Sequence, residues 1–455
     1  MENQTAAPAE RRGLAARLFS RSAIGPVLLI IASLLVGIVQ VPGHRGVSPV
    51  DEYVYIDYFS KVASQVVVHR GEETGTFARQ ELGCRGLRLL QPSPDARCEL
   101  QNAEKDSLFP FHGATSAYIY TPLYFGITRV LAEPLVWAGV GLVDAGRFVG
   151  ALWLAAAALF LYLALRRLKI HPVAATGVGL LMIGSLPAYW SNTYISTDAT
   201  ALFAGGLMLY LATRVDAGRS RLWFILGAAF VTLLKVQNLA AVAAAILFLV
   251  IRAAVLAYRT RASRAGWVGR TFADRRVITS IIALAAAFAG QVVWLAISSA
   301  IAIGPSPDMG VTVRPLGLTQ IILQSGLFLD GATKGVGDIT TFLRGPGLVS
   351  NYAVSFVAVA GVVGLLMASR WGTRRNAVAV ATFAAALVSA PILSVVTYVT
   401  LGTYVDPPPA RYGIALIPFF LACAALLLAK RPWPRWIMAG VGTIVFVVSL
   451  LLPQG

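Results

Sequence analysis

Five ionisable residues of this chain lie beside or inside long apolar runs, where charged side chains are rare. Asp51 and Glu52 follow the first apolar run, in "VSPVDEYVYIDYFSK". Asp198 begins a later apolar run, and Lys235 and Arg411 interrupt or precede others. Acids placed beside cations suit a reaction in which a hydroxyl group loses its proton and a phosphate group carries away negative charge. Tyr55, His112 and Tyr412 are further candidates for binding the substrate.

Asp51 also has a purely structural interpretation. Ser48 would cap a helix, Pro49 would be its first residue, and Asp51 would be the capping-box acid, favoured by the helix dipole. The functional interpretation places the same carboxylate at a rigid helix start, facing a substrate. The two interpretations are compatible, because a capping carboxylate can still accept a proton.

The other candidates have structural alternatives as well. Asp198 would simply start a helix with Ser196 or Thr197. Lys235 would extend to the lipid headgroups, although an ionisable residue among apolar residues near a membrane is a functional candidate by default. Arg411 would anchor a headgroup, or its planar guanidinium would hold a substrate phosphate.

Composition decides the class of protein. The chain has 455 residues, of which 57% are hydrophobic and 13% charged, and its mean hydropathy is +0.71. A soluble protein could not bury this much apolar surface, whereas a multi-pass membrane protein leaves it facing lipid. The net charge of +17 comes from short clusters between apolar runs, which orient membrane helices and do not indicate nucleic-acid binding.

The apolar runs predict an all-α polytopic membrane protein with about eleven transmembrane helices. With residues 1–22 as a cytoplasmic tail, the single transmembrane domain 23–455 places every basic cluster on the inner side, as the positive-inside rule requires. The N-terminus would then be cytoplasmic, in the plasma membrane. The predicted spans are 23–42, 146–165, 173–190, 198–213, 221–236, 238–257, 277–301, 352–369, 377–400, 412–429 and 436–452.

Two outer loops are large, at 43–145 and 302–351. Residues 117–140 are apolar enough to span, but a span there would move "LRRLK" outside, so we expect a helix lying at the outer interface. The stretch 316–339 predicts an amphipathic interfacial helix followed by a flexible turn. Cys84 and Cys98 share the first loop, and we expect them to form a disulfide in an oxidising compartment rather than remain free thiols.

The order of these features resembles the GT-C superfamily, the integral-membrane glycosyltransferases that use polyprenyl-phosphate-linked sugars. The resemblance covers the chain to about residue 430. It rests on the early "DE" pair, on "TPLYFGI" beside the family's Pro-Pro-Leu-Tyr-Tyr helix, on "GRFVGALWLAAAALFLYLALRRL", and on "ARYGIALIPFF". The stretch "DEYVYID" is also similar to a family of uncharacterised bacterial polytopic membrane proteins. The sequence departs from the pattern at Thr121, where the family often has proline.

The resemblance implies an inverting transfer of sugar from a polyprenyl-phosphate donor to a glycan, lipid or protein acceptor at the outer face. Carried over, Asp51 is the base, Glu52 a supporting acid, and Lys235 and Arg411 bind the lipid phosphate. Asp51, Glu52 and Asp198 are also candidate ligands for a divalent cation such as Mg²⁺ or Mn²⁺, because hard cations take carboxylate oxygens. The first alternative is a transporter or flippase of a lipid-linked or envelope precursor, which would show internal repeats and broken helices at mid-membrane. The others are a scaffold of an envelope-assembly complex and a polymerase or ligase of surface glycans, which usually places its large outer loop late in the chain.

Overall fold

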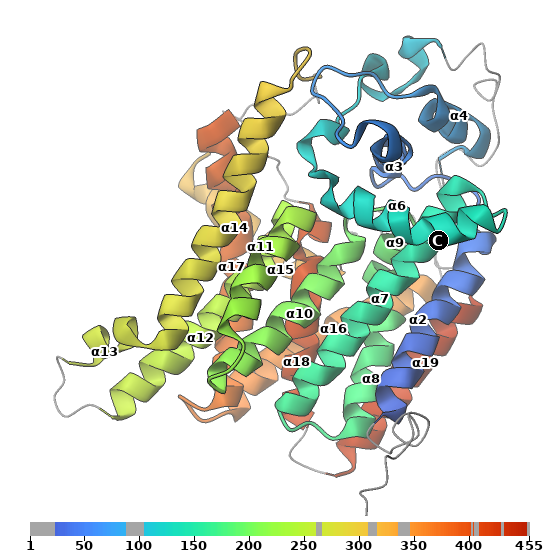
Figure 1. Ribbon diagram of the computed structural model, residues 1–455. Coiled ribbons are helices and arrows are strands. Elements are labelled where there is room, and N and C mark those ends of the chain that lie inside the picture. The colour runs from blue at the N-terminus through green and yellow to red at the C-terminus, as the bar shows by residue number, and fades with distance from the viewer. Residues whose placement is uncertain are drawn as a thin grey trace, which may run out of the picture.

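The computed structural model describes residues 23–87, 104–260, 266–307, 316–334, 346–401, 404, 409–428 and 432–452. This part of the chain is all-helical, as predicted, with seventeen α-helices and short 3₁₀ turns (Figure 1). The helices are α2 (Ile24–Gly43), α3 (Glu52–Gln65), α4 (Thr76–Arg85), α6 (Pro122–Trp137), α7 (Leu142–Arg167), α8 (Pro172–Ile183), α9 (Leu186–Asn192), α10 (Ala199–Asp216), α11 (Arg221–Leu234), α12 (Leu239–Arg259), α13 (Trp267–Ala273), α14 (Arg275–Ala300), α15 (Leu318–Lys334), α16 (Pro346–Ala368), α17 (Arg374–Leu401), α18 (Ile417–Leu428) and α19 (Pro434–Leu451).

Membrane-spanning helices form most of the fold. Seven helical segments of the described chain are long and apolar enough to cross a membrane, or eight when α8 and α9, bent by 59° at their junction, count as one. The multi-pass class is therefore confirmed. The remaining three predicted spans also fold as helices, namely α10, α11 and α16, but they do not meet the same test of length and hydropathy. The count of eleven stays a prediction.

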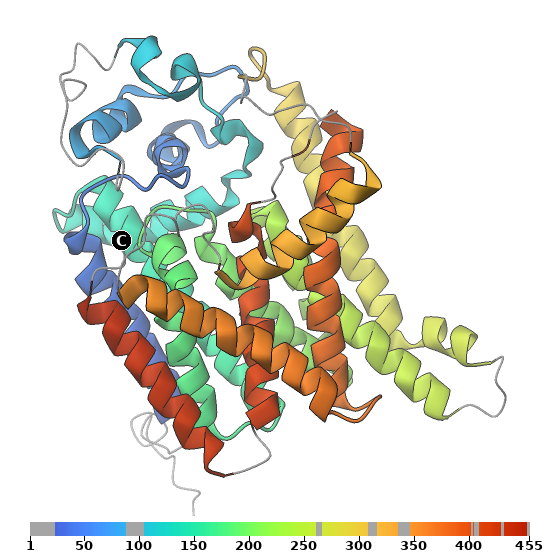
Figure 2. The ribbon, with the colours of Figure 1, turned by 180° about the vertical axis from the view of Figure 1, so that it is seen from behind.

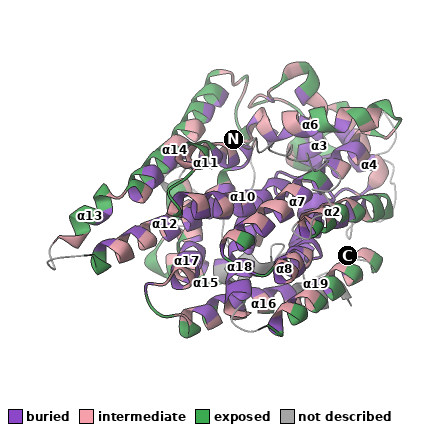
Figure 3. Ribbon diagram, turned by 60° about the horizontal axis from the view of Figure 1, so that its bottom comes forward, coloured by how far each residue is buried: buried purple, intermediate pink, exposed green. Residues whose placement is uncertain are grey.

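The centre of the bundle is closely packed. α7 and α10 are largely buried, whereas exposed apolar side chains cover the outer faces of α2, α14 and α19, as membrane-facing helices require (Figure 3). From behind, α16 lies obliquely across the bundle between α19 and α17 (Figure 2). Glycine allows the closest approach, between α8 and α19, where a Cβ on Gly442 would lie 2.0 Å from the carbonyl oxygen of Gly177.

One buried acid ties several helices together at the end of the bundle opposite α3 and α4. Asp216, at the end of α10, forms ion pairs with Arg252, Arg276 and Arg374, at 3.3, 3.3 and 3.0 Å. These arginines come from α12, α14 and α17. Arginines from basic clusters on three helices therefore lie together at one end of the described bundle, which we call the basic end.

The first large loop folds over the other end as a helical cap of α3, α4 and α6 (Figure 1). Asp57 accepts a hydrogen bond from the Gly75 amide at 2.8 Å and pairs with Lys61 at 3.1 Å, and its burial raises the pKa of the carboxyl. The carbonyl of Arg70 accepts from the amides of Ile303 and Gly304, at 3.0 and 3.1 Å. These bonds join the cap to the segment that follows α14.

Two helices predicted at the membrane surface are present. α6, within 117–140, is not one of the candidate spans, and Figure 1 shows it crossing the end of α7. Thr121 caps it and Pro122 is its first residue. α15 covers part of the stretch 316–339 and packs against α17. The turn predicted after it lies outside the described residues, and the position of either helix in a bilayer is not tested by the fold.

Candidate functional site

The start of α3 separates the two adjacent acids. The helix begins at Glu52, and Asp51 is its N-cap residue, with a φ of 57° and no side-chain capping hydrogen bond. The capping-box interpretation, with Ser48 as cap and Asp51 as its acid, is therefore wrong. Ser48 Oγ instead accepts from the amide of Val50 at 3.1 Å. The left-handed backbone at Asp51, a conformation that Asp tolerates better than most residues, turns its carboxylate away from the helix.

Glu52 and Arg147 form a pair that we call the closed centre. Both side chains are 0% exposed, and two bonds of 2.8 Å join the guanidinium of Arg147 to the two carboxylate oxygens. The amides of Ser48 and Ile195 also donate to Glu52, at 2.7 and 2.9 Å, and Arg147 donates to the carbonyl of His44 at 3.1 Å. The pair thus joins the α3 start, α7 and the segment before α10, and it leaves Glu52 no accessible surface.

Asp51, Arg411, Asp198 and Lys235 form a second group, the open centre. Arg411 Nη2 lies 2.6 Å from Asp51 Oδ2, and Arg411 Nη1 lies 3.9 Å from Asp198 Oδ2. Asp198 Oδ1 pairs in turn with the Lys235 ammonium. The side chains of Asp198 and Lys235 are 4% and 2% exposed, that of Arg411 is 18% and that of Asp51 is 41%. The four charges therefore alternate in sign and run from a buried lysine to an accessible carboxylate.

Aromatic side chains surround the open centre. The ring of Tyr412 lies 5.8 Å from both the Lys235 ammonium and the Arg411 guanidinium. The hydroxyls of Tyr55 and Tyr120 are 3.1 Å apart, and Thr197 donates to Tyr55 at 3.3 Å. Burial raises the pKa of Tyr55 well above its ordinary value, and the nearby phenol of Tyr120 raises it further. Both phenols therefore remain neutral hydrogen-bonding groups at ordinary pH.

The structure thus brings together six of the predicted site residues, Asp51, Asp198, Lys235, Arg411, Tyr55 and Tyr412. Glu52 lies one residue away in sequence but belongs to the closed centre. His112 is exposed in a turn of the cap, Pro110–Gly113, with a φ of 51°, and no contact in the described chain joins it to the open centre. Cys84 is disulfide-bonded. Cys98 lies outside the described residues, so the pairing of these two cysteines stays a prediction.

Sequence reasoning did not single out Arg147, Tyr120 or Thr197 as site residues. The sequence did contain a reason to single out Arg147. It is an ionisable residue at the start of an apolar span, and such a residue requires a partner. Tyr120 and Thr197 had none, since an uncharged hydroxyl near a helix end is common.

The predicted carboxylates do not make a convincing cation site. Both oxygens of Glu52 accept from Arg147 and from backbone amides, and Asp51 and Asp198 each face a cationic side chain. Among the residues that the structure describes, no group of three His, Cys, Asp or Glu is arranged to hold a metal ion. The positive charge near Asp51 comes from Arg411 and Lys235.

Comparisons with known proteins add no family. No protein-family model matches the chain, and no curated protein matches it significantly. What stands is an all-helical, multi-pass membrane protein with two ionic centres under a helical cap. The interpretation of the open centre rests on its geometry.

Proposed function

We propose that this protein is a membrane glycosyltransferase of the GT-C type, which moves a sugar from a polyprenyl-phosphate donor to an acceptor hydroxyl. The observation that carries the proposal is the open centre, in which a half-exposed carboxylate touches an arginine backed by a buried Asp–Lys pair. The resemblance in the order of sequence motifs adds support. In this proposal the eleven spans place the centre at the outer face of the plasma membrane.

Asp51 is the residue best placed to act as general base. It is the most exposed of the four charged side chains, so an acceptor hydroxyl can approach it. The acceptor oxygen attacks the anomeric carbon while its proton passes to Asp51. The bond between the anomeric carbon and the phosphate oxygen breaks, and its electron pair leaves with polyprenyl phosphate. Attack opposite the leaving group inverts the configuration.

Arg411 and Lys235 stabilise the leaving phosphate in different ways. Arg411 is partly exposed and offers a planar set of donors, which suits direct hydrogen bonds to phosphate oxygens. Lys235 is almost completely buried beneath it, so it contributes positive charge rather than a first contact. Asp198 holds the lysine in place and neutralises part of its charge before the donor arrives.

The test is transfer of sugar by the purified protein from a polyprenyl-phosphate-linked donor, comparing Asp51→Asn with Asp144→Asn. Asp144 is a matched control because its side chain is 39% exposed and its shorter contact is with an arginine outside both centres, Arg85 at 3.0 Å; its contact with Arg147 is longer, at 3.8 Å. We expect Asp51→Asn to lower the transfer rate by roughly 10²–10⁴-fold, as removal of a general base does. Asp144→Asn should leave the rate within about twofold of wild type, since a partly exposed ion pair contributes little.

Two results would contradict the proposal. One is a wild-type protein that releases no polyprenyl phosphate from any sugar-linked donor tested. The other is an Asp51→Asn protein, folded as judged by its denaturation midpoint, that transfers sugar as fast as the Asp144→Asn control.

A further inference from the structure

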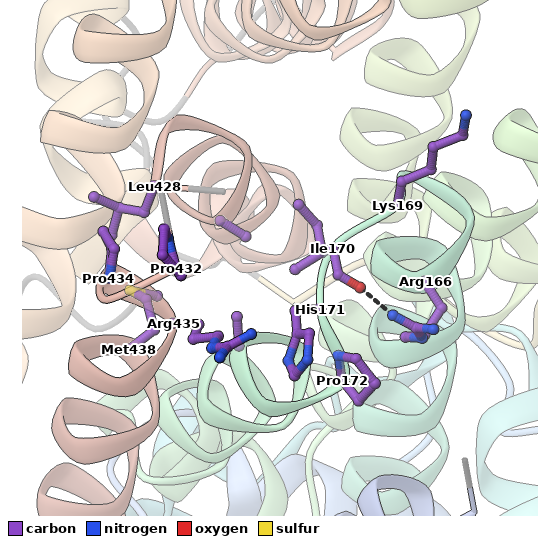
Figure 4. Close-up of a pocket in the computed structure, with 12 residues that line it drawn as sticks. Arg166, Lys169, Ile170, His171, Pro172, Leu428, Pro432, Pro434, Arg435 and Met438 are labelled. Carbon is purple, nitrogen blue, oxygen red and sulfur yellow. Dashed lines mark hydrogen bonds between the residues drawn. The ribbon is translucent and has the colours of Figure 1, made fainter. Parts of the chain in front are cut away.

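A cavity of about 400 Å³ lies at the basic end, and no residue of the open centre lines it. Figure 4 shows its lining side chains. It is formed by the turn between α7 and α8, the end of α18 and the beginning of α19. The lining residues are Arg166, Lys169, Ile170, His171, Pro172, Ala174, Ala425, Leu428, Pro432, Pro434, Arg435 and Met438. Its volume is in the range of pockets that hold small ligands.

The ionisable groups of this cavity are all basic. Arg166, Lys169, His171 and Arg435 line it, and its twelve lining residues contain no carboxylate. His171 lies between Arg166 and Arg435 in Figure 4. Desolvation lowers the pKa of His171 most, and the positive charges of Arg435 and Arg166 lower it further. Arg166 donates to the carbonyl of Ile170, and the Nε of Arg435 is buried without a hydrogen-bond partner in the described chain. The cavity thus collects positive charge that nothing within it balances.

Two helix N-termini add to this positive potential. α8 begins at Pro172 and α19 begins at Pro434, and both prolines line the cavity. The N-terminal end of each helix carries partial positive charge, so it favours an anion, and in α8 the amide of Val173 already donates to His171 Nδ1 at 3.3 Å. The close contact between Gly177 and Gly442 holds the two helices together just beyond these ends. Side chains and backbone therefore favour the same kind of ligand.

The surroundings indicate where such a ligand comes from. Trp433 and Trp436, beside Arg435, are both exposed, and the outer face of α19 is apolar. Exposed tryptophans next to an apolar helix face are typical of the boundary between lipid tails and headgroups. A basic pocket between helices at this depth suits an anionic headgroup.

We propose that this cavity, which we call the basic pocket, binds the phosphate group of an anionic phospholipid. Arg166 and Arg435 pair with the phosphate oxygens, and the ends of α8 and α19 face the same group. The acyl chains lie along α19. The same chemistry would accept a soluble phosphate, and the experiment separates the two sources.

The test compares Arg166→Gln/Arg435→Gln with Arg270→Gln/Arg370→Gln. The control pair also removes two positive charges at the basic end, from exposed arginines that do not line the pocket. Each purified protein is titrated with phosphatidylglycerol or phosphatidylcholine in neutral detergent, and bound lipid is counted by native mass spectrometry. A parallel titration uses inorganic phosphate, followed by the shift in denaturation temperature.

We expect the wild type and the control pair to bind phosphatidylglycerol in preference to phosphatidylcholine. Loss of the two pocket arginines should weaken phosphatidylglycerol binding by roughly tenfold or more. If millimolar inorganic phosphate stabilises the wild type but not the pocket variant, the pocket is an anion site whose ligand is a soluble phosphate and not a lipid. Equal lipid binding by both double variants, with no phosphate effect that depends on the pocket, would overturn the proposal. An unaltered denaturation midpoint without ligand shows that the pocket variant is folded.

Discussion

The closed centre and the open centre are built from the same residue types, and their difference lies in what remains unsatisfied. In the closed centre, Glu52 and Arg147 use their oxygens and nitrogens on each other and on backbone groups, Arg147 has one further, longer contact of 3.8 Å with Asp144, and neither side chain of the pair has exposed surface. In the open centre, Asp51 has a single arginine contact and keeps 41% of its side chain exposed. A saturated pair can hold helices in place but cannot exchange partners. A pair with accessible atoms can release its arginine to an incoming anion.

The largest expected difference between the closed centre and the open centre is in their contribution to the free energy of unfolding. Arg147→Met leaves the Glu52 carboxylate buried without its cation, which should lower the free energy of unfolding by about 3–5 kcal/mol. The matched change Arg411→Met leaves Asp51 accessible to water, and we expect a loss below about 1 kcal/mol. The measurement is the midpoint of SDS-induced unfolding in mixed micelles. Equal losses for the two variants would show that the centres do not differ as described.

Asp198 and Lys235 form the buried half of the open centre, and their contribution to stability can be measured separately. Asp198→Asn leaves Lys235 buried near Arg411 without its acid, and we expect a loss of about 3 kcal/mol. Because the two residues form one pair, adding Lys235→Met should recover about 1–2 kcal/mol of that loss. The same unfolding assay on the two single variants and the double variant gives the coupling. Strictly additive losses would mean that the contact contributes nothing.

A smaller effect separates charge from geometry at Arg411. Arg411→Lys keeps the positive charge but removes the planar set of donors, so the KM for the lipid-linked donor should rise by roughly tenfold. Lys61→Arg, in the cap, is a control that exchanges the same two residue types away from the open centre. The readout is the dependence of initial rate on donor concentration. An unchanged KM for Arg411→Lys would remove the direct phosphate contact from the proposal.

The smallest expected effect concerns the hydroxyl network beside the open centre. Tyr55→Phe removes the group that contacts Tyr120 and Thr197, which should cost about 1 kcal/mol of stability, the usual value for one hydrogen bond. Tyr53→Phe is a control on the same helix, because Tyr53 is also a buried tyrosine. A larger loss for Tyr53→Phe than for Tyr55→Phe would rule out a special part for the Tyr55 network.

The fold was largely predictable, because apolar length is a physical requirement of a membrane span. Each of the eleven predicted segments lies on a helix, although seven or eight helices satisfy the criteria of length and hydropathy. Helix ends were less accessible to sequence reasoning. α3 starts at Glu52 rather than Pro49, because the carboxylate of Glu52 binds the amide of Ser48 and Asp51 takes a left-handed backbone.

The grouping of Asp51, Asp198, Lys235 and Arg411 followed from placing their loops at one end of the bundle. Which of the two adjacent acids stays accessible did not follow. Glu52 is the first residue of α3 and its side chain is buried, whereas Asp51 precedes the helix with a left-handed backbone and keeps 41% of its side chain exposed. The choice depends on Arg147, whose position against α3 is set by tertiary packing.

The short length of α11 bears on how a lipid substrate reaches the open centre. Its 14 residues rise about 21 Å, roughly 9 Å less than a typical hydrocarbon core. Lys235 follows its last residue directly, so if α11 crosses the membrane as the sequence predicts, the ammonium group lies below the level at which longer spanning helices leave the membrane. In that predicted arrangement the leaflet thins there or the mouth of the bundle is recessed, and the donor that we propose, a polyprenyl phosphate, would reach the site without withdrawing its chain from the bilayer. Depth-dependent quenching of a fluorophore attached at position 236, compared with one at position 302, would measure that recess.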